Sequence, residues 1–143
     1  MIDKTTRTRI KICGFTRESD VAEAIDAGVD AIGLVLYEKS ARAVTLELAT
    51  RLAALIPPFV TPVLLFVNPQ AELVREALQS IPTALLQFHG DESPLFCEQF
   101  SHPYIRAARI PAPNSSSPFH LTHYAQRYES ASAILLDTFT PHF

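Results

Sequence analysis

The sequence predicts an α/β fold of parallel strands joined by helical crossovers. It favours a TIM (β/α)8 barrel of which only about the first six βα units are present. Six strand-like segments and five helical segments alternate along the chain. The predicted strands end near positions 13, 36, 67, 88, 109 and 137, which gives a mean repeat of about 25 residues. A closed barrel of eight such units needs about 50–60 residues more than this chain of 143.

The predicted strands are short apolar or β-branched runs. In chain order they are Ile10–Cys13, Ala31–Leu36, Thr61–Val67, Ala84–Phe88, Tyr104–Ile110 and Ala133–Asp137. The run Ala31–Leu36 is apolar throughout, as expected for a strand that is buried on both faces. Such runs between turn residues are typical of parallel strands covered by helices.

The predicted helices begin at residues that commonly cap helices. These caps are Thr16, Thr45, Asn68 and Ser93, and in the last two cases a proline follows at the first helical position. A fifth helix is expected near His120–Tyr128, after the loop-like stretch Pro111–Pro118. Each cap precedes apolar residues at helical spacing, which supports the alternation of strands and helices.

Two features favour a closed barrel over an open doubly wound sheet. No Gly-x-Gly-x-x-Gly follows any predicted strand, so the usual dinucleotide-binding loop of a doubly wound sheet is missing from the sequence. Polar or reactive side chains also stand at or after the carboxyl ends of the strands, where a barrel places its active site. They are Cys13, Arg42, Asn68, Gln87, His89, Arg109 and Asp137.

Composition excludes several classes of protein. With 12 Lys+Arg against 15 Asp+Glu the net charge is −3, and the basic residues are scattered, which argues against a nucleic-acid partner. Two cysteines do not make a disulfide framework, which favours a reducing, cytoplasmic location. The uncharged stretch 52–71 contains four prolines, so no membrane span is expected.

Cys13 and Asp137 are the candidates for acid–base chemistry. Cys13 is either a small buried hydrophobe or a thiol that points into a barrel mouth and is activated there. Asp137 either caps a loop or is a partly desolvated acid suited to proton donation. Together the two groups would suit the movement of a proton between substrate atoms. Cys97, beside two phenylalanines, is expected to be part of the core.

Three further residues are candidates for substrate contacts. Arg42 is either a solvated loop cation or a guanidinium fork for a substrate carboxylate. Gln87 and His89 flank Phe88 at the fourth strand end, and His89 either faces a ligand or only supports the loop by hydrogen bonds. No set of His, Asp and Glu ligands stands at the strand ends, so no metal is expected, and a metal-dependent epimerase is disfavoured.

Five motifs, in order and over nearly the whole chain, resemble the phosphoribosylanthranilate isomerase family of tryptophan biosynthesis. They are Lys-Ile-Cys-Gly at 11–14, Ser-x-Arg at 40–42, Leu-Phe-Val-Asn at 65–68, Gln-Phe-His-Gly-Asp-Glu at 87–92 and Leu-Leu-Asp-Thr at 135–138. The first motif alone is fairly specific. In combination with the fourth and fifth it is very specific.

The resemblance implies a (β/α)8 barrel that performs an Amadori rearrangement without a cofactor or metal. The substrate would be N-(5′-phosphoribosyl)anthranilate and the product 1-(2-carboxyphenylamino)-1-deoxyribulose 5-phosphate, so the expected partner is a small phosphosugar. By position, Cys13 matches the family's general base and Asp137 its general acid. Arg42 matches the arginine that meets the anthranilate carboxylate, and His89 with Gln87 would line the substrate pocket.

The sequence departs from the family after the sixth strand. Members continue with a glycine-rich loop and with strands seven and eight, whose loops bind the substrate phosphate. The expectation is therefore a single barrel domain over residues 1–143 that is incomplete at its carboxyl end, with strands seven and eight missing. The alternative is a catalytically silent fragment whose two open sheet edges pair with another copy as a homo-oligomer.

Overall fold

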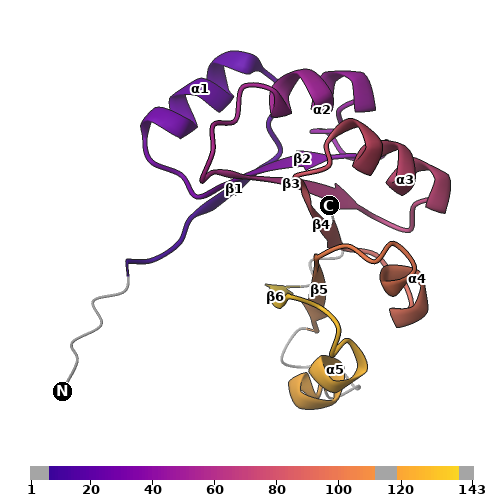
Figure 1. The fold of residues 1–143 in the computed structure, drawn as a ribbon. Helices are drawn as coiled ribbons and strands as arrows, with labels where there is room; N and C mark the ends of the chain where they lie inside the picture. The colour runs from indigo at the N-terminus through magenta and orange to yellow at the C-terminus, as the bar shows by residue number, and fades with distance from the viewer. Residues whose placement is uncertain (1–6, 112–118, 139–143) are drawn as a thin grey trace.

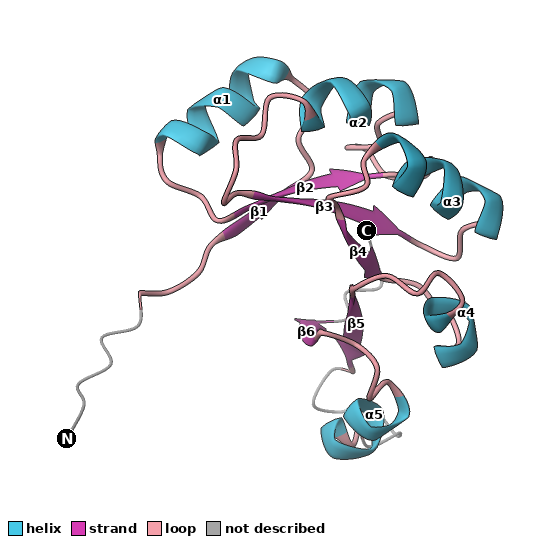
Figure 2. Ribbon diagram, viewed as in Figure 1, coloured by secondary structure: helices cyan, strands magenta, loops and turns pink. Residues whose placement is uncertain are grey.

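The computed structural model describes residues 7–111 and 119–138, and in them six strands and five helices alternate (Figure 2). The strands are β1 Lys11–Cys13, β2 Ala31–Val35, β3 Thr61–Phe66, β4 Leu85–Phe88, β5 Tyr104–Ile110 and β6 Ala133–Thr138. The helices are α1 Glu18–Asp26, α2 Leu46–Ala53, α3 Ala71–Ser80, α4 Pro94–Glu98 and α5 Leu121–Arg127. The predicted order of elements is confirmed, with ends that differ by one residue in most strands.

The six strands form one curved sheet in sequence order, and every neighbouring pair is parallel. All five helices lie on the outer, convex side of this sheet (Figure 1). Parallel strands in sequence order with helices outside form an arc of a (β/α)8 barrel. This confirms the predicted fold class for the first six units.

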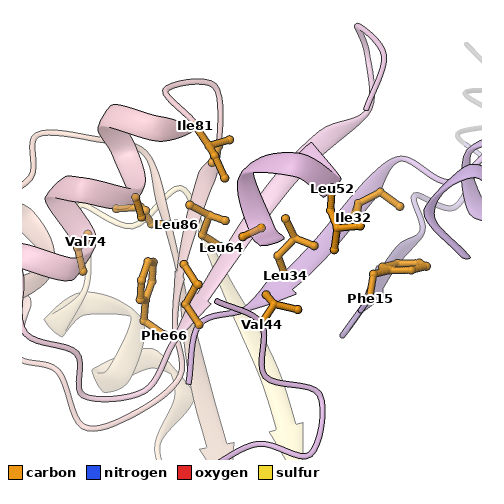
Figure 3. Packing of buried hydrophobic residues seen from close by; sticks show 14 of the residues in the cluster. Phe15, Ile32, Leu34, Val44, Leu52, Leu64, Phe66, Val74, Ile81 and Leu86 are labelled. Atoms are coloured by element: carbon orange, nitrogen blue, oxygen red, sulfur yellow. The ribbon is translucent and has the colours of Figure 1, made fainter. Parts of the chain in front are cut away.

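The hydrophobic core lies between the sheet and its helices (Figure 3). Alternate strand residues enter this core: Ile32, Leu34, Leu64, Phe66, Leu86 and Phe88 are all fully buried in it. Because side chains alternate along a strand, the residues between them face the concave side of the sheet. Gly33 and Gln87 are two of these residues, and both become important at the candidate site.

Two of the four predicted helix caps are confirmed. The Thr45 hydroxyl accepts a hydrogen bond from the backbone N–H of Leu48 at 3.2 Å, and α2 follows. The Ser93 hydroxyl accepts one from the backbone N–H of Phe96 at 3.2 Å, with Pro94 at the start of α4. Each bond satisfies an N–H group that the first helical turn leaves without a partner.

The other two predicted caps are wrong. Arg17, not Thr16, is the N-cap of α1, and its side chain makes no capping bond. Gln70 is the N-cap of α3, whereas Asn68 lies two residues earlier with a φ of 47°. A contact with the loop after β4 holds Asn68 there, as described below. The loop expected at Pro111–Pro118 lies outside the described residues, except for Pro111.

Asp30 anchors the beginnings of β1 and β2. Its carboxylate accepts hydrogen bonds from the backbone N–H of Ile10 and from the guanidinium of Arg7, both at 2.8 Å. These bonds lower the pKa of Asp30 to about 2, and the bond from Arg7 has the largest effect.

Within the described part of the chain, every helix is too short or too polar to span a bilayer.

Candidate active site

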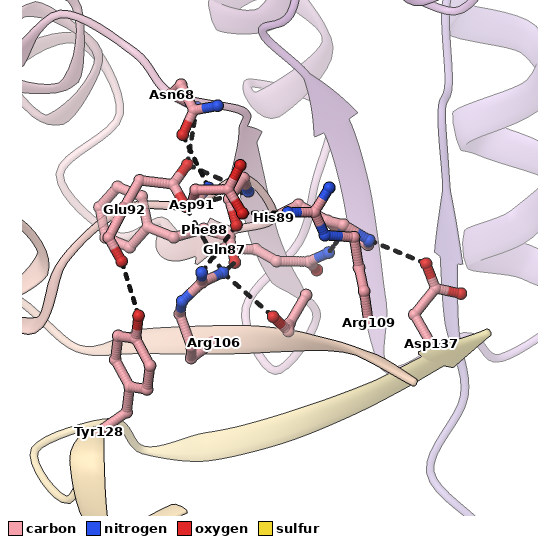
Figure 4. A network of polar contacts seen from close by, with 12 residues as sticks. Asn68, Gln87, Phe88, His89, Asp91, Glu92, Arg106, Arg109, Tyr128 and Asp137 are labelled. Atoms are coloured by element: carbon pink, nitrogen blue, oxygen red, sulfur yellow. Dashed lines mark hydrogen bonds and ion pairs between the residues drawn. The ribbon is translucent and has the colours of Figure 1, made fainter. Parts of the chain in front are cut away.

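The carboxyl ends of the parallel strands meet along one edge of the sheet, and the candidate residues stand there. Cys13 ends β1, and Gln87 lies in β4, which His89 directly follows. Asp137 is the last but one residue of β6. The polar contacts that join β3, β4, β5 and β6 at this edge are drawn in Figure 4. This is the edge at which (β/α)8 barrels carry their active sites.

Cys13 points to the concave side of the sheet, over Gly33 of β2. The two residues are paired in register, and a Cβ on Gly33 would lie 2.6 Å from the Cys13 sulfur. The thiol therefore occupies the space that any larger residue at position 33 would need. Ile32 and Leu34 on either side of Gly33 enter the helix-side core, so the sulfur lies on the opposite side, away from the helices.

Arg42 lies across the turn that follows β1. Its Nη1 donates a hydrogen bond to the carbonyl oxygen of Cys13 at 2.7 Å. Gly14 allows this approach, because a Cβ there would lie 2.6 Å from Cδ of Arg42, and because its φ of 95° suits glycine. The structure thus brings Arg42 to the backbone of Cys13, although 29 residues separate them in the chain.

The loop that carries Arg42 also borders a hollow of about 650 Å³. Its lining consists of Tyr37, Lys39, Ser40, Ala41 and Arg42. The hydroxyl of Ser40 accepts a hydrogen bond from the backbone N–H of Arg42 at 3.1 Å, which stabilises the loop at its tip. The Arg42 side chain is exposed to solvent. It therefore has donors available for an anion as well as the bond to Cys13.

Gln87, His89 and Asp137 form a row of hydrogen bonds that links the carboxyl ends of β4 and β6 (Figure 4). The Gln87 amide nitrogen lies 3.1 Å from Nδ1 of His89, and Nε2 of His89 lies 3.0 Å from Oδ2 of Asp137. Gln87 is 1% exposed, whereas the side chains of His89 and Asp137 are 22% and 47% exposed. The row therefore runs from the interior toward solvent and ends at the candidate acid.

Behind this row lies a buried ion pair that the sequence analysis missed. Glu92 and Arg106 approach to 3.4 Å, with side-chain exposures of 2% and 3%. Arg106 donates hydrogen bonds at 2.7 Å to the carbonyl oxygens of Phe88 and Gly90, on either side of His89. The guanidinium also lies over the ring of Tyr128, 4.9 Å from its centroid. The pair therefore fixes the backbone that carries His89.

Glu92 extends the same network to the end of β3. Its carboxylate accepts hydrogen bonds from the backbone N–H groups of Asn68 at 2.8 Å and Gly90 at 2.9 Å. The Asn68 side chain in turn accepts one from the backbone N–H of Asp91 at 2.7 Å. A Cβ on Gly90 would lie 2.5 Å from Oδ1 of Asn68, so this approach needs glycine. These contacts explain why Asn68 is not a helix cap.

One signal in the sequence pointed to the buried pair. Arg106 interrupts Tyr104–Ile110, a strand whose neighbouring positions are apolar, and it lies in register with Phe88 and Ile134. A buried charge needs a partner, and Glu92 ends the motif that follows β4.

Arg109, which was expected at this edge from the sequence, pairs with Asp91. Cys97 is fully buried in the core, as expected.

The comparisons with known proteins agree with this geometry. The family model described as N-(5'phosphoribosyl)anthranilate (PRA) isomerase matches residues 10–140. Curated N-(5'-phosphoribosyl)anthranilate isomerases from Leptothrix cholodnii and Methylibium petroleiphilum are 56% and 53% identical over 96% and 93% of this chain. In both cases the match covers 60% of the relative. The chain thus spans about three fifths of the length of these relatives.

Solved structures give the same result. The phosphoribosyl anthranilate isomerase from Thermotoga maritima superposes with a TM-score of 0.81 and 32% identity over 96% of this chain and 64% of its own. A phosphoribosyl anthranilate isomerase in complex with reduced 1-(o-carboxyphenylamino)-1-deoxyribulose 5-phosphate reaches 0.78 and 32%, over 93% and 66%. The motifs, the strand order and these matches lead to one conclusion: the chain belongs to the N-(5'-phosphoribosyl)anthranilate isomerase family.

Proposed function

We propose that the protein catalyses the Amadori rearrangement of N-(5′-phosphoribosyl)anthranilate in tryptophan biosynthesis. The observation that carries this proposal is the arrangement at the carboxyl ends of the strands. A thiol on β1 faces the concave side, and a carboxylic acid on β6 is held by the histidine that directly follows β4. A proton donor and a proton acceptor at one edge are what an internal proton transfer requires.

In this proposal Asp137 is the general acid and Cys13 the general base. Asp137 in its protonated form gives a proton to the ribose ring oxygen, which opens the furanose to a Schiff base. Cys13 as thiolate then removes the proton from C2′, and the resulting enolamine tautomerises to the ketone. The substrate gains one proton from Asp137 and loses one to Cys13, and C2′ is oxidised while C1′ is reduced, so the product is an isomer and no redox partner is needed. The half-exposed Asp137 side chain is accessible from the open side of the sheet.

Arg42 is proposed to bind the anthranilate carboxylate. Its exposure and its place beside the Cys13 backbone support this role, because a substrate held there would lie next to the thiol. His89 is proposed to line the same pocket from the other side. A related enzyme was solved with a reduced 1-(o-carboxyphenylamino)-1-deoxyribulose 5-phosphate, and we infer that a phosphosugar of this class binds here.

The direct test is the reaction itself. The intact protein is incubated with N-(5′-phosphoribosyl)anthranilate, and the conversion to an isomer of the same mass is followed by chromatography and NMR. We expect turnover, and we expect it to persist after exhaustive chelation. A folded protein that leaves this substrate unchanged would overturn the proposal. The single-domain organisation over residues 1–143 and the cytoplasmic location stay predictions.

A further inference from the structure

The row formed by Gln87, His89 and Asp137 has a direction that follows from the chemistry of its donors. The amide nitrogen of Gln87 can only donate, and it lies 3.1 Å from Nδ1 of His89. Nδ1 must therefore present a lone pair, and the proton of the neutral imidazole is at Nε2. That nitrogen lies 3.0 Å from Oδ2 of Asp137, which accepts.

We propose that Gln87 is a positioning residue that acts through His89: it holds the imidazole in the Nε2–H tautomer and so directs a hydrogen bond at Oδ2 of Asp137. This inference rests on the proposed function for its role in the reaction. It differs from the expectation that Gln87 lines the substrate pocket. With 1% exposure, the Gln87 side chain has almost no surface with which to meet a substrate.

The arrangement assigns different tasks to the two oxygens of Asp137. Because Oδ2 accepts from His89, the proton that Asp137 transfers is carried by Oδ1. When that proton leaves for the ribose ring oxygen, negative charge develops on the carboxylate, and the Nε2–H bond to it strengthens. His89 therefore stabilises the product of the proton transfer more than its starting state, which is the condition for accelerating the step.

The position of Gln87 within the sheet makes this support rigid. Gln87 is in β4 and is paired in register with Leu65 of β3 and Ile105 of β5. Side chains on a strand are held more firmly than those on a loop. Its Oε1 atom is buried with no hydrogen-bond partner among the described residues, which costs stability. An apolar residue would avoid this cost, so stability does not account for the amide.

The charged residue nearest to Asp137 in the sheet does not pair with it, so the contact of Asp137 with His89 has no competitor there. Arg109 of β5 is in register with Asp137 of β6 and could have paired with it. The Arg109 guanidinium instead pairs with Asp91, in the loop after β4. Gln87 thus contacts one ring nitrogen of His89, and Asp137 contacts the other. The charges of Arg109 and Asp91 neutralise each other.

The tautomer can be measured directly in the intact protein by ¹⁵N NMR of the histidine rings. The chain has five histidines, and a His89→Asn variant identifies the signals of His89. We expect a protonated Nε2 and an unprotonated Nδ1 in the absence of substrate. Protonation of Nδ1, in the neutral ring or in the imidazolium, would overturn the proposal. This measurement does not depend on catalytic activity, so it is separate from the test of the proposed function.

Two substitutions at position 87 sharpen the test. Gln87→Met keeps the length of the side chain but removes the donor, so His89 should lose its single tautomer, and kcat should fall about tenfold or more with KM near the wild-type value. Gln87→Glu places an acceptor opposite Nδ1 and should draw a proton to it. Gln79→Glu, on the exposed surface of α3, is the matched control and should change neither readout.

The outcomes separate positioning from substrate binding. A Gln87→Met variant that keeps both the wild-type tautomer and the wild-type kcat would overturn the proposal. A raised KM with an unchanged kcat would also overturn it, because that pattern belongs to a group that contacts substrate equally in the ground and transition states. If the tautomer is as expected but the intact protein does not isomerise the substrate, the proposed function fails and the assignment of the tautomer stands.

Discussion

The two halves of the candidate site are built in different ways. On the β1–β2 side, Cys13 lies over a glycine, and its backbone is held by one exposed arginine, Arg42. On the β4–β6 side, Asp137 is backed by His89, by a buried glutamine and, behind them, by a buried ion pair. One half relies on small residues and open space, whereas the other relies on a dense polar network.

The difference follows from what each half must do. A general acid that changes charge needs a donor fixed in one direction, and a buried network supplies this because its members cannot rotate independently. A thiol that must reach a substrate carbon needs clearance, which Gly33 provides next to the sulfur, whereas Gly14 makes room for Arg42. We therefore expect substitutions of the buried side chains on the β4–β6 side to affect stability as well as activity, and substitutions of the more exposed Cys13 and Arg42 side chains on the β1–β2 side to affect mainly activity.

The largest effect is expected from breaking the buried ion pair. Glu92→Gln leaves the Arg106 guanidinium buried without its counter-charge, and it should lower the free energy of unfolding by about 3–5 kcal/mol. Chemical denaturation of the intact protein measures this. Glu72→Gln removes a carboxylate that is 75% exposed and 3.4 Å from Arg75, and it should change the stability by less than about 1 kcal/mol. Equal losses would mean that the pair does not hold the network.

The candidate catalytic groups come next. Cys13→Ser and Asp137→Asn should each lower kcat by at least about 10²-fold, the usual scale for a positioned acid or base. Neither should reduce the stability as Glu92→Gln does, because both side chains are partly exposed. Cys97→Ala is the control for the thiol and should leave kcat near the wild-type value. A loss of kcat in the Cys97 variant alone would place the reactive thiol elsewhere.

Substitutions of Arg42 test the β1–β2 side of the site separately. Arg42→Ala should raise KM about tenfold or more and lower kcat less, since a carboxylate contact is made in the ground and transition states alike. Arg42→Lys keeps the charge but loses the planar fork, so it should recover only part of the affinity. Gly14→Ala should raise KM as well, because the added methyl group displaces the arginine, and it should also lower the stability because alanine is strained at a φ of 95°. Equal KM values in all variants would make Arg42 a solvated loop residue.

The smallest effect is expected at the opposite end of β1. The pKa of Asp30 is lowered to about 2 from its ordinary value of 3.8, so its carboxylate favours the folded state above about pH 4. This contribution should be lost as the pH falls from about 4 to 2. An Asp30→Asn variant should lack that part of the pH dependence of the urea midpoint. If the midpoints of both proteins fall in parallel over this range, Asp30 does not support β1.

The fold could be predicted from the sequence because its signals are local. Continuous apolar runs such as Ala31–Leu36 and cap residues such as Thr45 and Ser93 act within a few residues. The Asn68 prediction failed because its competing partner is distant: Asp91 and Glu92 bind it from 23 and 24 residues further along the chain. Local propensity cannot anticipate such a contact.

The candidate site could be predicted only in part for the same reason. The motifs identified Cys13, Arg42, His89 and Asp137 by position, and the strand order places all four at one edge of the sheet. The sequence did not tell which way the thiol points, because that depends on Gly33 of the next strand. Nor did it pair Glu92 with Arg106, because Glu92 lies in the loop after β4 and Arg106 in β5, and the pairing of these elements cannot be read from the sequence alone.

The two thiols of the chain also differ in their accessibility to alkylating reagents. Cys97 is fully buried, and burial raises the pKa of its thiol to about 12, so in the folded protein it resists alkylating reagents. Cys13 lies on the open side of the sheet and can be reached without unfolding. Mass spectrometry after alkylation should therefore detect one label at these two positions in the folded protein and two after unfolding. The rate at which the second label appears would report how often α4 opens, with no engineered probe.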